Sequence, residues 1–317
     1  MYLEQFTSPI SESDLKKIQD SIKGEFKLAK RWLVEDGNEI LEMSKEKNVV
    51  LLAYGDPYIA TTHIELRARA IENKIKTHSI HASSSLTSMI GECGLHFYKI
   101  GRIATIMSEM KSLTTPYYVI YKNLIEGNHT VLLLEYNQDK KFFLDPKDAL
   151  KGLLETEQGQ ARKVITESNY VIIASRIGFK DQAIVSGKIS SLKETDFGQP
   201  PHTIIIPGRL HFTESDALKL FGKCVDEPFD NSEKTEKISK QMIKKYVPMV
   251  REALEEIEPL YKNQKEFEVI LDNAERYIKD AEIFLGEGRD ENAILSIGYA
   301  DGLVDALRLA KGLEFKM

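Results

Sequence analysis

One stretch of the chain, residues 48–63, constrains the fold more than any other. Its first half, V-V-L-L-A at residues 49–53, is a short apolar run that starts with β-branched residues, and this pattern predicts a strand buried on both faces, as in a parallel sheet. A Gly-Asp-Pro turn at residues 55–57 ends the strand, because proline cannot continue a central ladder. From Ala60 onward the apolar residues have helical spacing. The stretch therefore predicts strand, turn and helix, with Asp56 at the carboxyl end of a parallel strand, where open α/β sheets bind ligands.

The composition narrows the class of protein. A chain of 317 residues is longer than one hydrophobic core usually serves, so we expect two or three domains. The net charge of −6 argues against a nucleic-acid-binding surface. Cys93 and Cys224 are the only cysteines and lie far apart, which favours free thiols in a reducing compartment and predicts no metal site. No apolar run approaches the ~20 residues of a membrane span and no secretory signal opens the chain, so we expect a cytoplasmic protein that contacts no membrane.

A second loop follows the first helix. Residues 76–81 predict another strand of the same sheet, and the run A-S-S-S-L-T at residues 82–87 then opens a helix. Small residues at a helix start let a ligand approach backbone N–H groups closely, although a serine-rich helix cap explains the same run without a ligand. Residues 101–107 predict the last strand of this first domain.

The middle of the chain predicts a second α/β domain. Three apolar runs alternate with helical stretches such as residues 146–160, and a Thr-Pro pair at residue 115 is a good helix start. The predicted strands are residues 130–136, 170–175 and 203–206. The heptad D-F-G-Q-P-P-H at residues 196–202 leads into the last of them, and its two prolines fix the direction of the backbone. A histidine before a strand, taken alone, is more often a packing residue than a ligand-binding one.

The last part of the chain is helical. A polar linker at residues 228–234 precedes three segments whose apolar residues recur at three and four. Breaks at residues 262–264 and 286–288 are short, so we expect an antiparallel bundle, with a kink or break at Pro248 inside the first helix. Asp301 and Asp305 lie one turn apart, which would suit catalysis or metal binding, but a solvated face is the expected role. The domain boundaries predicted from these patterns are residues 1–110, 111–227 and 228–317.

Three motifs in this order carry a family resemblance: Y-G-D-P-Y-I-A-T-T-H from residue 54, H-A-S-S-S-L-T-S-M-I-G-E-C-G from residue 81, and the heptad at 196–202. Together they resemble the diphthine synthases, a branch of the tetrapyrrole methylases, over residues 1–221. The resemblance implies two α/β domains with S-adenosylmethionine in the cleft between them. The string A-I-L-S-I-G-Y-A-D-G-L-V-D-A-L from residue 293 resembles the end of a small helical domain of unknown function found in archaeal proteins.

The resemblance also implies which residues contact the cofactor. They lie on the Gly-Asp-Pro turn, on the serine-rich loop, and at the ends of the second domain's strands: Asp56, Ile59, Ser85, Leu86, Leu134, Ile177 and His202. Ile177 stands where the family has alanine, so its side chain would narrow the pocket. The absence of a recognisable catalytic dyad does not argue against this activity, because methyl transfer from a sulfonium needs chiefly that donor and acceptor be held in line and that water be excluded. The resemblance names no catalytic residue.

The implied acceptor is the amino group of a modified histidine of translation elongation factor 2, and the implied assembly is a homodimer. Two alternatives stay open: a methyltransferase for a tetrapyrrole precursor, and a non-catalytic scaffold or binding module. The second is motivated by the N-terminus, because residues 2–8 resemble the family's second strand and turn, so that a first strand and helix of about 25 residues have no counterpart. Either the true start lies upstream or part of the site has been lost.

Overall fold

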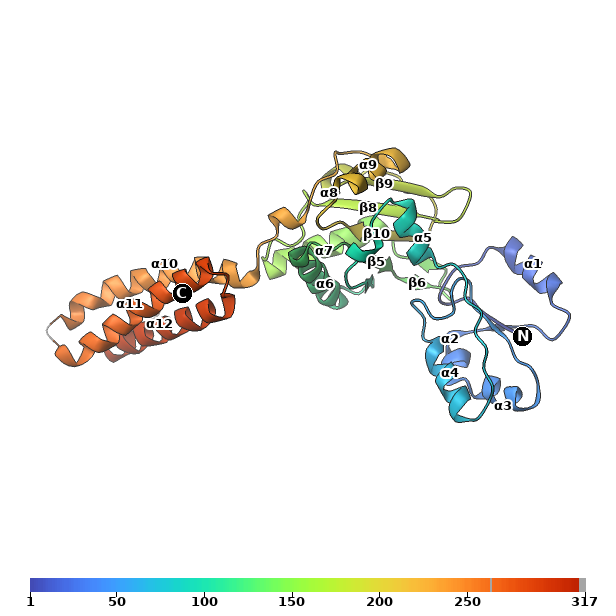
Figure 1. Ribbon diagram of the computed structural model, residues 1–317, viewed down its shortest axis with the longest axis horizontal. Helices are drawn as coiled ribbons and strands as arrows, with labels where there is room; N and C mark the ends of the chain where they lie inside the picture. Colours follow the sequence, from blue (N-terminus) through green and yellow to red (C-terminus); the bar gives the residue numbers. More distant parts are fainter. Residues whose placement is uncertain (263, 314–317) are drawn as a thin grey trace. The chain divides into compact units, whose positions relative to one another are not determined.

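The computed structural model describes residues 1–262 and 264–313, apart from the side chain of Met110. The chain divides into two compact units, Met1–Thr235 and Glu236–Met317 (Figure 1), which we call the α/β unit and the helical unit. The α/β unit contains a three-stranded sheet, which we call the first sheet, a six-stranded sheet, which we call the second sheet, and a small hairpin. The predicted α/β class with a helical C-terminal region is confirmed.

The first sheet is small and entirely parallel, in the order β2-β1-β3. Its strands are β1 (Tyr2–Glu4), β2 (Lys27–Ala29) and β3 (Leu51–Leu52). Three helices bury apolar side chains with it, and α1 (Glu12–Ser21) buries none; the three are α2 (Arg31–Asp36), α3 (Asn38–Glu46) and α4 (His63–Glu72).

Three local predictions for this region are wrong. The strand expected at residues 49–53 is reduced to Leu51–Leu52, and it is not buried on both faces, since these two residues are half-buried and Val50 is exposed. The helix expected from Ala60 begins at His63, because Ala60 has a positive φ of 57° and belongs to the turn. Residues 76–81 form no strand; five of these six residues are polar and no neighbouring strand pairs with them.

The second sheet has the order β11-β9-β8-β10-β5-β4. Its strands are β4 (Ala104–Ile106), β5 (Thr130–Leu134), β8 (Tyr170–Ser175), β9 (Ala183–Lys188), β10 (His202–Ile206) and β11 (Lys223–Cys224). The strands predicted around residues 130–136, 170–175 and 203–206 are therefore confirmed, although a separate hairpin of β6 (Tyr136–Asn137) and β7 (Phe142–Phe143) follows the first. The strand at 101–107 exists as β4, but its place in the first domain's sheet was wrong, because Ala104 pairs with Leu132 of β5.

Both faces of the second sheet are covered. On one face lie α6 (Thr114–Glu126), α7 (Pro146–Gln160) and α8 (Ile189–Leu192), and on the other lie α5 (Ser85–Glu92) and α9 (Phe212–Phe221). Every residue of the central strand β8 is consequently buried. Cys93, at the end of α5, has no exposed surface, and burial, together with the nearby Glu92, raises the pKa of its thiol to about 12. Three short 3-10 helices complete the unit: η1 (Phe97–Lys99), η2 (Met110–Leu113) and η3 (Ser232–Lys234).

A buried carboxylate fixes α9 to the second sheet. The side chain of Glu214 has no exposed surface and accepts hydrogen bonds from His129 Nε2 (2.9 Å) and from the backbone N–H groups of His96 and His211 (both 2.7 Å), as well as from Lys99 Nζ. Burial by itself would raise the pKa of Glu214, but these donors outweigh it and hold the pKa well below its usual range. Gly208 N–H donates to His129 Nδ1, so the proton of the neutral imidazole is on Nε2 and points at the carboxylate.

The segment expected to be a polar linker, residues 228–234, lies within the α/β unit. Asn231 is 1% exposed, and its side chain amide binds the backbone N–H and C=O of Tyr170 and the carbonyl of Pro207. These bonds attach the segment to the start of β8, and the α/β unit accordingly extends to Thr235.

The helical unit consists of α10 (Ile238–Tyr261), α11 (Lys265–Gly286) and α12 (Asp290–Ala310) (Figure 1). Lys237 pairs with Asp290 (2.9 Å) and Tyr261 donates to the carbonyl of Leu307 (2.6 Å), so α10 and α12 run parallel with α11 antiparallel between them in the chain. The unit buries a hydrophobic core made only of its own residues. Of the two outcomes expected at Pro248, the break does not occur: α10 continues through both Pro248 and Pro259, and Val247 and Val250 are buried in the core on either side of Pro248. The kink stays a prediction.

Candidate cofactor site

The predicted site residues on the first sheet's side lie on two loops. Asp56 follows β3, and its side chain is only 8% exposed. One carboxylate oxygen accepts the backbone N–H of Tyr58 (2.9 Å) and the other binds His81 Nδ1 (2.8 Å). The hydrogen bond from Tyr58, and then that from His81, hold the pKa of Asp56 below its usual range. The carboxylate is therefore ionised at neutral pH and joins the two loops.

The serine-rich loop lies directly beside the Gly-Asp-Pro turn. Gly55 has φ of 116°, and a Cβ on it would lie 3.6 Å from the carbonyl oxygen of Ser83. Ser84 caps α5 by accepting the backbone N–H of Leu86 (3.2 Å), and Ser85 is the first residue of the helix. Leu86 is buried in the core beneath the second sheet, so it can offer a ligand its backbone but not its side chain. Ile59 is 38% exposed in the turn before α4.

The other three predicted residues meet at one edge of the second sheet. Leu134 ends β5, Ile177 follows the end of β8, and His202 begins β10. Because β10 is antiparallel to both neighbours, with Thr203 paired to Leu133 and His202 to Ser175, its start lies beside their ends. The heptad is tied to this edge by Arg176, whose backbone N–H donates to the carbonyl of Pro201 (2.9 Å).

A shared core cluster connects the two groups. Leu86 on α5 packs in the same cluster as Ala174 of β8, and Ile177 packs against that cluster. The structure thus brings the serine-rich loop toward the end of β8, and through that loop the Gly-Asp-Pro turn. The side chain of Leu134 points elsewhere, because it packs against the core on the opposite face of the second sheet.

Two buried polar atoms near these residues have no hydrogen-bond partner among the described residues. One is Nε2 of His63, a residue that is 4% exposed. His63 Nδ1 binds the carbonyl of Pro57 (3.0 Å), and since a carbonyl only accepts, the proton is on Nδ1 and Nε2 is a free acceptor. The other is Oγ of Ser175, which pairs with His202 across the sheet. Because side chains alternate along β8, Ser175 lies on the same face of the second sheet as Leu134, opposite Ala174. Unpaired buried polar atoms are costly, and a polar ligand would relieve the cost, so these atoms fit a cofactor with hydroxyl and amino groups.

Sequence reasoning did not include His63, Ser175 or His81 in the site. His63 closes the first motif, T-T-H, and His81 opens the second, so their positions in the motifs were the available signal. Ser175 stands in a fully apolar strand, where only the structure reveals that its hydroxyl lacks a partner.

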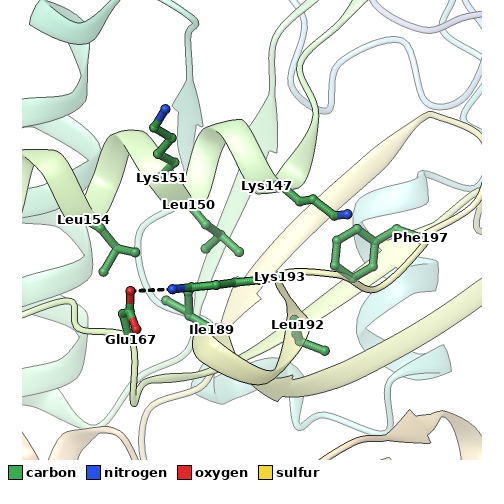
Figure 2. Close-up of a pocket in the computed structure, with 9 residues that line it drawn as sticks. All are labelled: Lys147, Leu150, Lys151, Leu154, Glu167, Ile189, Leu192, Lys193 and Phe197. Atoms are coloured by element: carbon green, nitrogen blue, oxygen red, sulfur yellow. Dashed lines mark hydrogen bonds and ion pairs between the residues drawn. The ribbon is translucent and has the colours of Figure 1, made fainter.

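A pocket of about 290 Å³ lies between α7, α8 and the start of the heptad (Figure 2). Its walls are apolar and its rim carries three lysines, one of which, Lys193, is paired with Glu167 (2.6 Å). None of the seven predicted cofactor residues lines it. The only link is Phe197, five residues before His202 in the chain, so this pocket is not the candidate cofactor site.

Two features are absent from the described residues. No group of three or more His, Cys, Asp or Glu side chains among them could hold a metal ion. Within the same residues no helix is both long enough and apolar enough to cross a membrane.

Comparisons with known proteins give a consistent family. The family model for tetrapyrrole (corrin/porphyrin) methylases matches residues 8–193, and a model described as a protein of unknown function, DUF357, matches residues 245–313. Diphthine synthase of Methanococcus vannielii is 36% identical over 222 residues, 69% of this chain and 87% of that protein. Diphthine synthase of Methanocaldococcus jannaschii is 36% identical over 224 residues with the same coverage.

A solved structure agrees with these relatives. A crystal structure of diphthine synthase superimposes with a TM-score of 0.63 at 28% identity, covering 71% of this chain and 85% of that one. The chain therefore belongs to the tetrapyrrole methylase family, together with the diphthine synthases, and is an S-adenosylmethionine-dependent methyltransferase.

Proposed function

We propose that this protein is a diphthine synthase, which transfers methyl groups from S-adenosylmethionine to the amino group of the modified histidine of translation elongation factor 2. The observation that carries the proposal is the identity of 36% to diphthine synthases over 87% of their length. The heptad at residues 196–202, which resembles that branch in particular, supports it.

The proposed roles of the residues follow from their surroundings. S-adenosylmethionine, when bound, supplies an electrophilic methyl group. The ionised Asp56 and the free acceptor on His63 would accept hydrogen bonds from its polar groups, and Ser175 would either donate or accept. Ile177, just after the end of β8, and His202, at the start of β10, would line the side of the site opposite Asp56 and His63. An amine attacks only when neutral, so the acceptor must be held where its ammonium form is not stabilised.

The test is transfer of labelled methyl groups to elongation factor 2 that carries the amino-bearing intermediate on its histidine. Elongation factor 2 without that modification is the matched control. We expect label to appear in the modified factor alone. Equal labelling of both factors, or labelling of neither by protein that binds the cofactor, would contradict the proposal.

One structural observation favours the alternative of a non-catalytic binding module. The first sheet has only three strands of two or three residues among the described residues, and its strand β3 is half-buried. Calorimetry separates the two functions. Binding of S-adenosylmethionine at about micromolar dissociation constant supports the enzyme, and absence of heat at millimolar cofactor supports the binding module.

We also propose a homodimer formed through the α/β unit. Five large apolar side chains on η1 and α9 are more than 60% exposed: Phe97, Tyr98, Phe212, Leu220 and Phe221. The rings of Tyr98, His96, His211 and Phe212 lie next to one another in that order, which connects η1 with the start of α9. Contiguous apolar surface of this kind is typical of interfaces. A monomer in ultracentrifugation at tens of micromolar, an order-of-magnitude choice for a stable interface, would argue against it. Since its proposed substrate works in translation, we expect the protein in the cytoplasm.

A further inference from the structure

Helix α12 of the helical unit turns an almost uncharged face to solvent. Three large side chains on it are well exposed: Leu295 (58%), Tyr299 (56%) and Leu309 (67%). Small exposed residues lie between them: Gly298, Gly302 and Ala306. At 100° per residue all six lie within about 60° of Gly302 around the helix axis. The charged residues of α12 in that sector are Glu291, one turn before Leu295, and Asp305 at the margin. The stretch from Leu295 to Leu309, which we call the α12 face, therefore has few charges for a solvated helix surface.

The side chains of the α12 face have a symmetric order. Leu295 and Leu309 lie seven residues before and seven residues after Gly302, and Gly298 and Ala306 lie four before and four after it. Read in either direction, the face is therefore large, small, small, small, large. Two such helices laid antiparallel, with Gly302 at the crossing point, would set Leu295 against the partner's Leu309 and Gly298 against the partner's Ala306.

Two larger residues lie at the margins of this pairing. Tyr299 and Asp305 lie three residues before and after Gly302, at the two margins of the face. A two-fold axis between antiparallel helices sets each margin against the same margin of the partner, so the two Tyr299 side chains would flank one side of the contact and the two Asp305 side chains the other. The ring of Tyr277 on α11 stacks on that of Tyr299 at 5.4 Å and 26°, which holds Tyr299 in place. Glycine and alanine between the large residues let two helix backbones approach closely.

From this symmetry we infer that α12 pairs with α12 of a second copy of the chain, antiparallel and centred on Gly302. A two-fold interface uses the same patch on both subunits, and a patch whose order is unchanged on reversal meets that requirement. The face is about 21 Å long, at 1.5 Å per residue. One helix pair of this length buries less than a standard interface, so we expect a dissociation constant of about 10–100 μM. This inference does not depend on the proposed methyl transfer.

The experiment uses residues 236–317 as a separate chain, because this unit has its own core, and measures its mass by analytical ultracentrifugation against concentration. We expect L295E and L309K each to weaken the association at least about tenfold. V269E, which changes an equally exposed apolar residue on α11, is the matched control and should leave it unchanged. Circular dichroism shows whether each variant is folded.

Mixing the two weakened variants tests the antiparallel register. In a mixed pair one leucine contact becomes a Glu–Lys ion pair and the other remains leucine on leucine, so L295E mixed with L309K should associate better than either alone. Parallel pairing sets equivalent residues together and predicts no rescue. A monomer up to about 1 mM, equal loss in V269E, or absence of rescue in the mixture would each overturn the inference.

Discussion

The two sheets of the α/β unit differ in how completely they are buried. In the second sheet, β8 is buried along its whole length between two core clusters. In the first sheet, β3 is half-buried and the three strands have two or three residues each. Both sheets supply predicted cofactor residues. The second sheet holds its three at strand ends, whereas the first holds Asp56 and Ile59 on turns.

This difference separates rigid from adaptable parts of the site. Strand ends in a closely packed sheet cannot move without disturbing the core. Turns that are joined by a few hydrogen bonds, such as those of Asp56, can open locally at small cost. We therefore expect the second sheet to determine stability and the first to determine how the cofactor is enclosed.

The largest expected effect compares two buried carboxylates: Glu214 on α9, which packs on the second sheet, and Glu4 at the end of β1 in the first sheet. E214A removes the acceptor of two ring or ammonium donors and two backbone N–H groups, and should cost about 3–5 kcal/mol of unfolding free energy in urea titrations at pH 7. E4A leaves only the backbone N–H groups of Phe6 and Thr7 and one hydroxyl unpaired, and should cost about 1–3 kcal/mol. Equal costs would remove the contrast between the sheets.

The same carboxylate predicts a pH dependence. The pKa of Glu214 is lower in the folded protein than its ordinary value of 4.5, so its stabilisation is complete above about pH 4.5 and is lost as the pH falls below it. The difference in unfolding free energy between wild type and E214A should therefore shrink as the pH is lowered from about 5 to about 3. A constant difference over that range would show that packing, and not charge, is lost in the variant.

Core truncations sharpen the contrast with uncharged residues. I172A removes a side chain with no exposed surface from the second sheet and should cost about 2–5 kcal/mol. L51A removes a half-buried side chain from the first sheet and should cost about 1 kcal/mol. Chemical denaturation of both variants measures the difference. A cost for L51A as great as that for I172A would mean that the first sheet is as tightly packed as the second.

The next prediction concerns binding and not stability. D56A frees His81 and the Tyr58 N–H, so the two loops lose their bridge. We expect at least about tenfold weaker binding of S-adenosylmethionine, or about 1.4 kcal/mol, with little change in melting temperature. D20N on exposed α1 is the control. Unchanged affinity in D56A would exclude this turn from the site.

The smallest expected effect is that of removing the helical unit. A chain that ends at Thr235 keeps both sheets and should bind the cofactor within about twofold of the full chain, measured by calorimetry. A chain that ends at Asp230 is the instructive contrast, because it lacks Asn231 and so leaves the backbone of Tyr170 unpaired. If the chain that ends at Thr235 is still folded by circular dichroism but binds the cofactor much more weakly than the full chain, the helical unit contributes to the site.

Sequence alone predicted the elements whose signals are local. Helix α7 was placed correctly because Asp145 caps it and Pro146 starts it, and β8 because six consecutive residues suit a strand buried on both faces. The cofactor residues came from motifs, not from periodicity, and their contact with the cofactor stays a prediction.

What failed depends on partners distant in the chain. Strand β9, A-I-V-S-G-K, contains serine and glycine and becomes recognisable only through its pairing with β8. Residues 76–81 resembled a strand but have no neighbouring strand to pair with, and β4 joined the second sheet because β5 was available to it. The unpaired atoms of His63 and Ser175 are likewise properties of the folded environment.

The rate at which the buried Cys93 is alkylated can measure how often α5 opens. Its thiol lies in the core under α5, the helix that begins at the serine-rich loop, and its raised pKa leaves almost no thiolate at neutral pH. An alkylating reagent can reach it only in the moments when α5 has lifted from the sheet. The alkylation rate of Cys93, followed by mass spectrometry in the native protein, therefore reports how often α5 opens. If the cofactor binds at the start of α5 and stabilises it, the alkylation rate will fall when the cofactor is added.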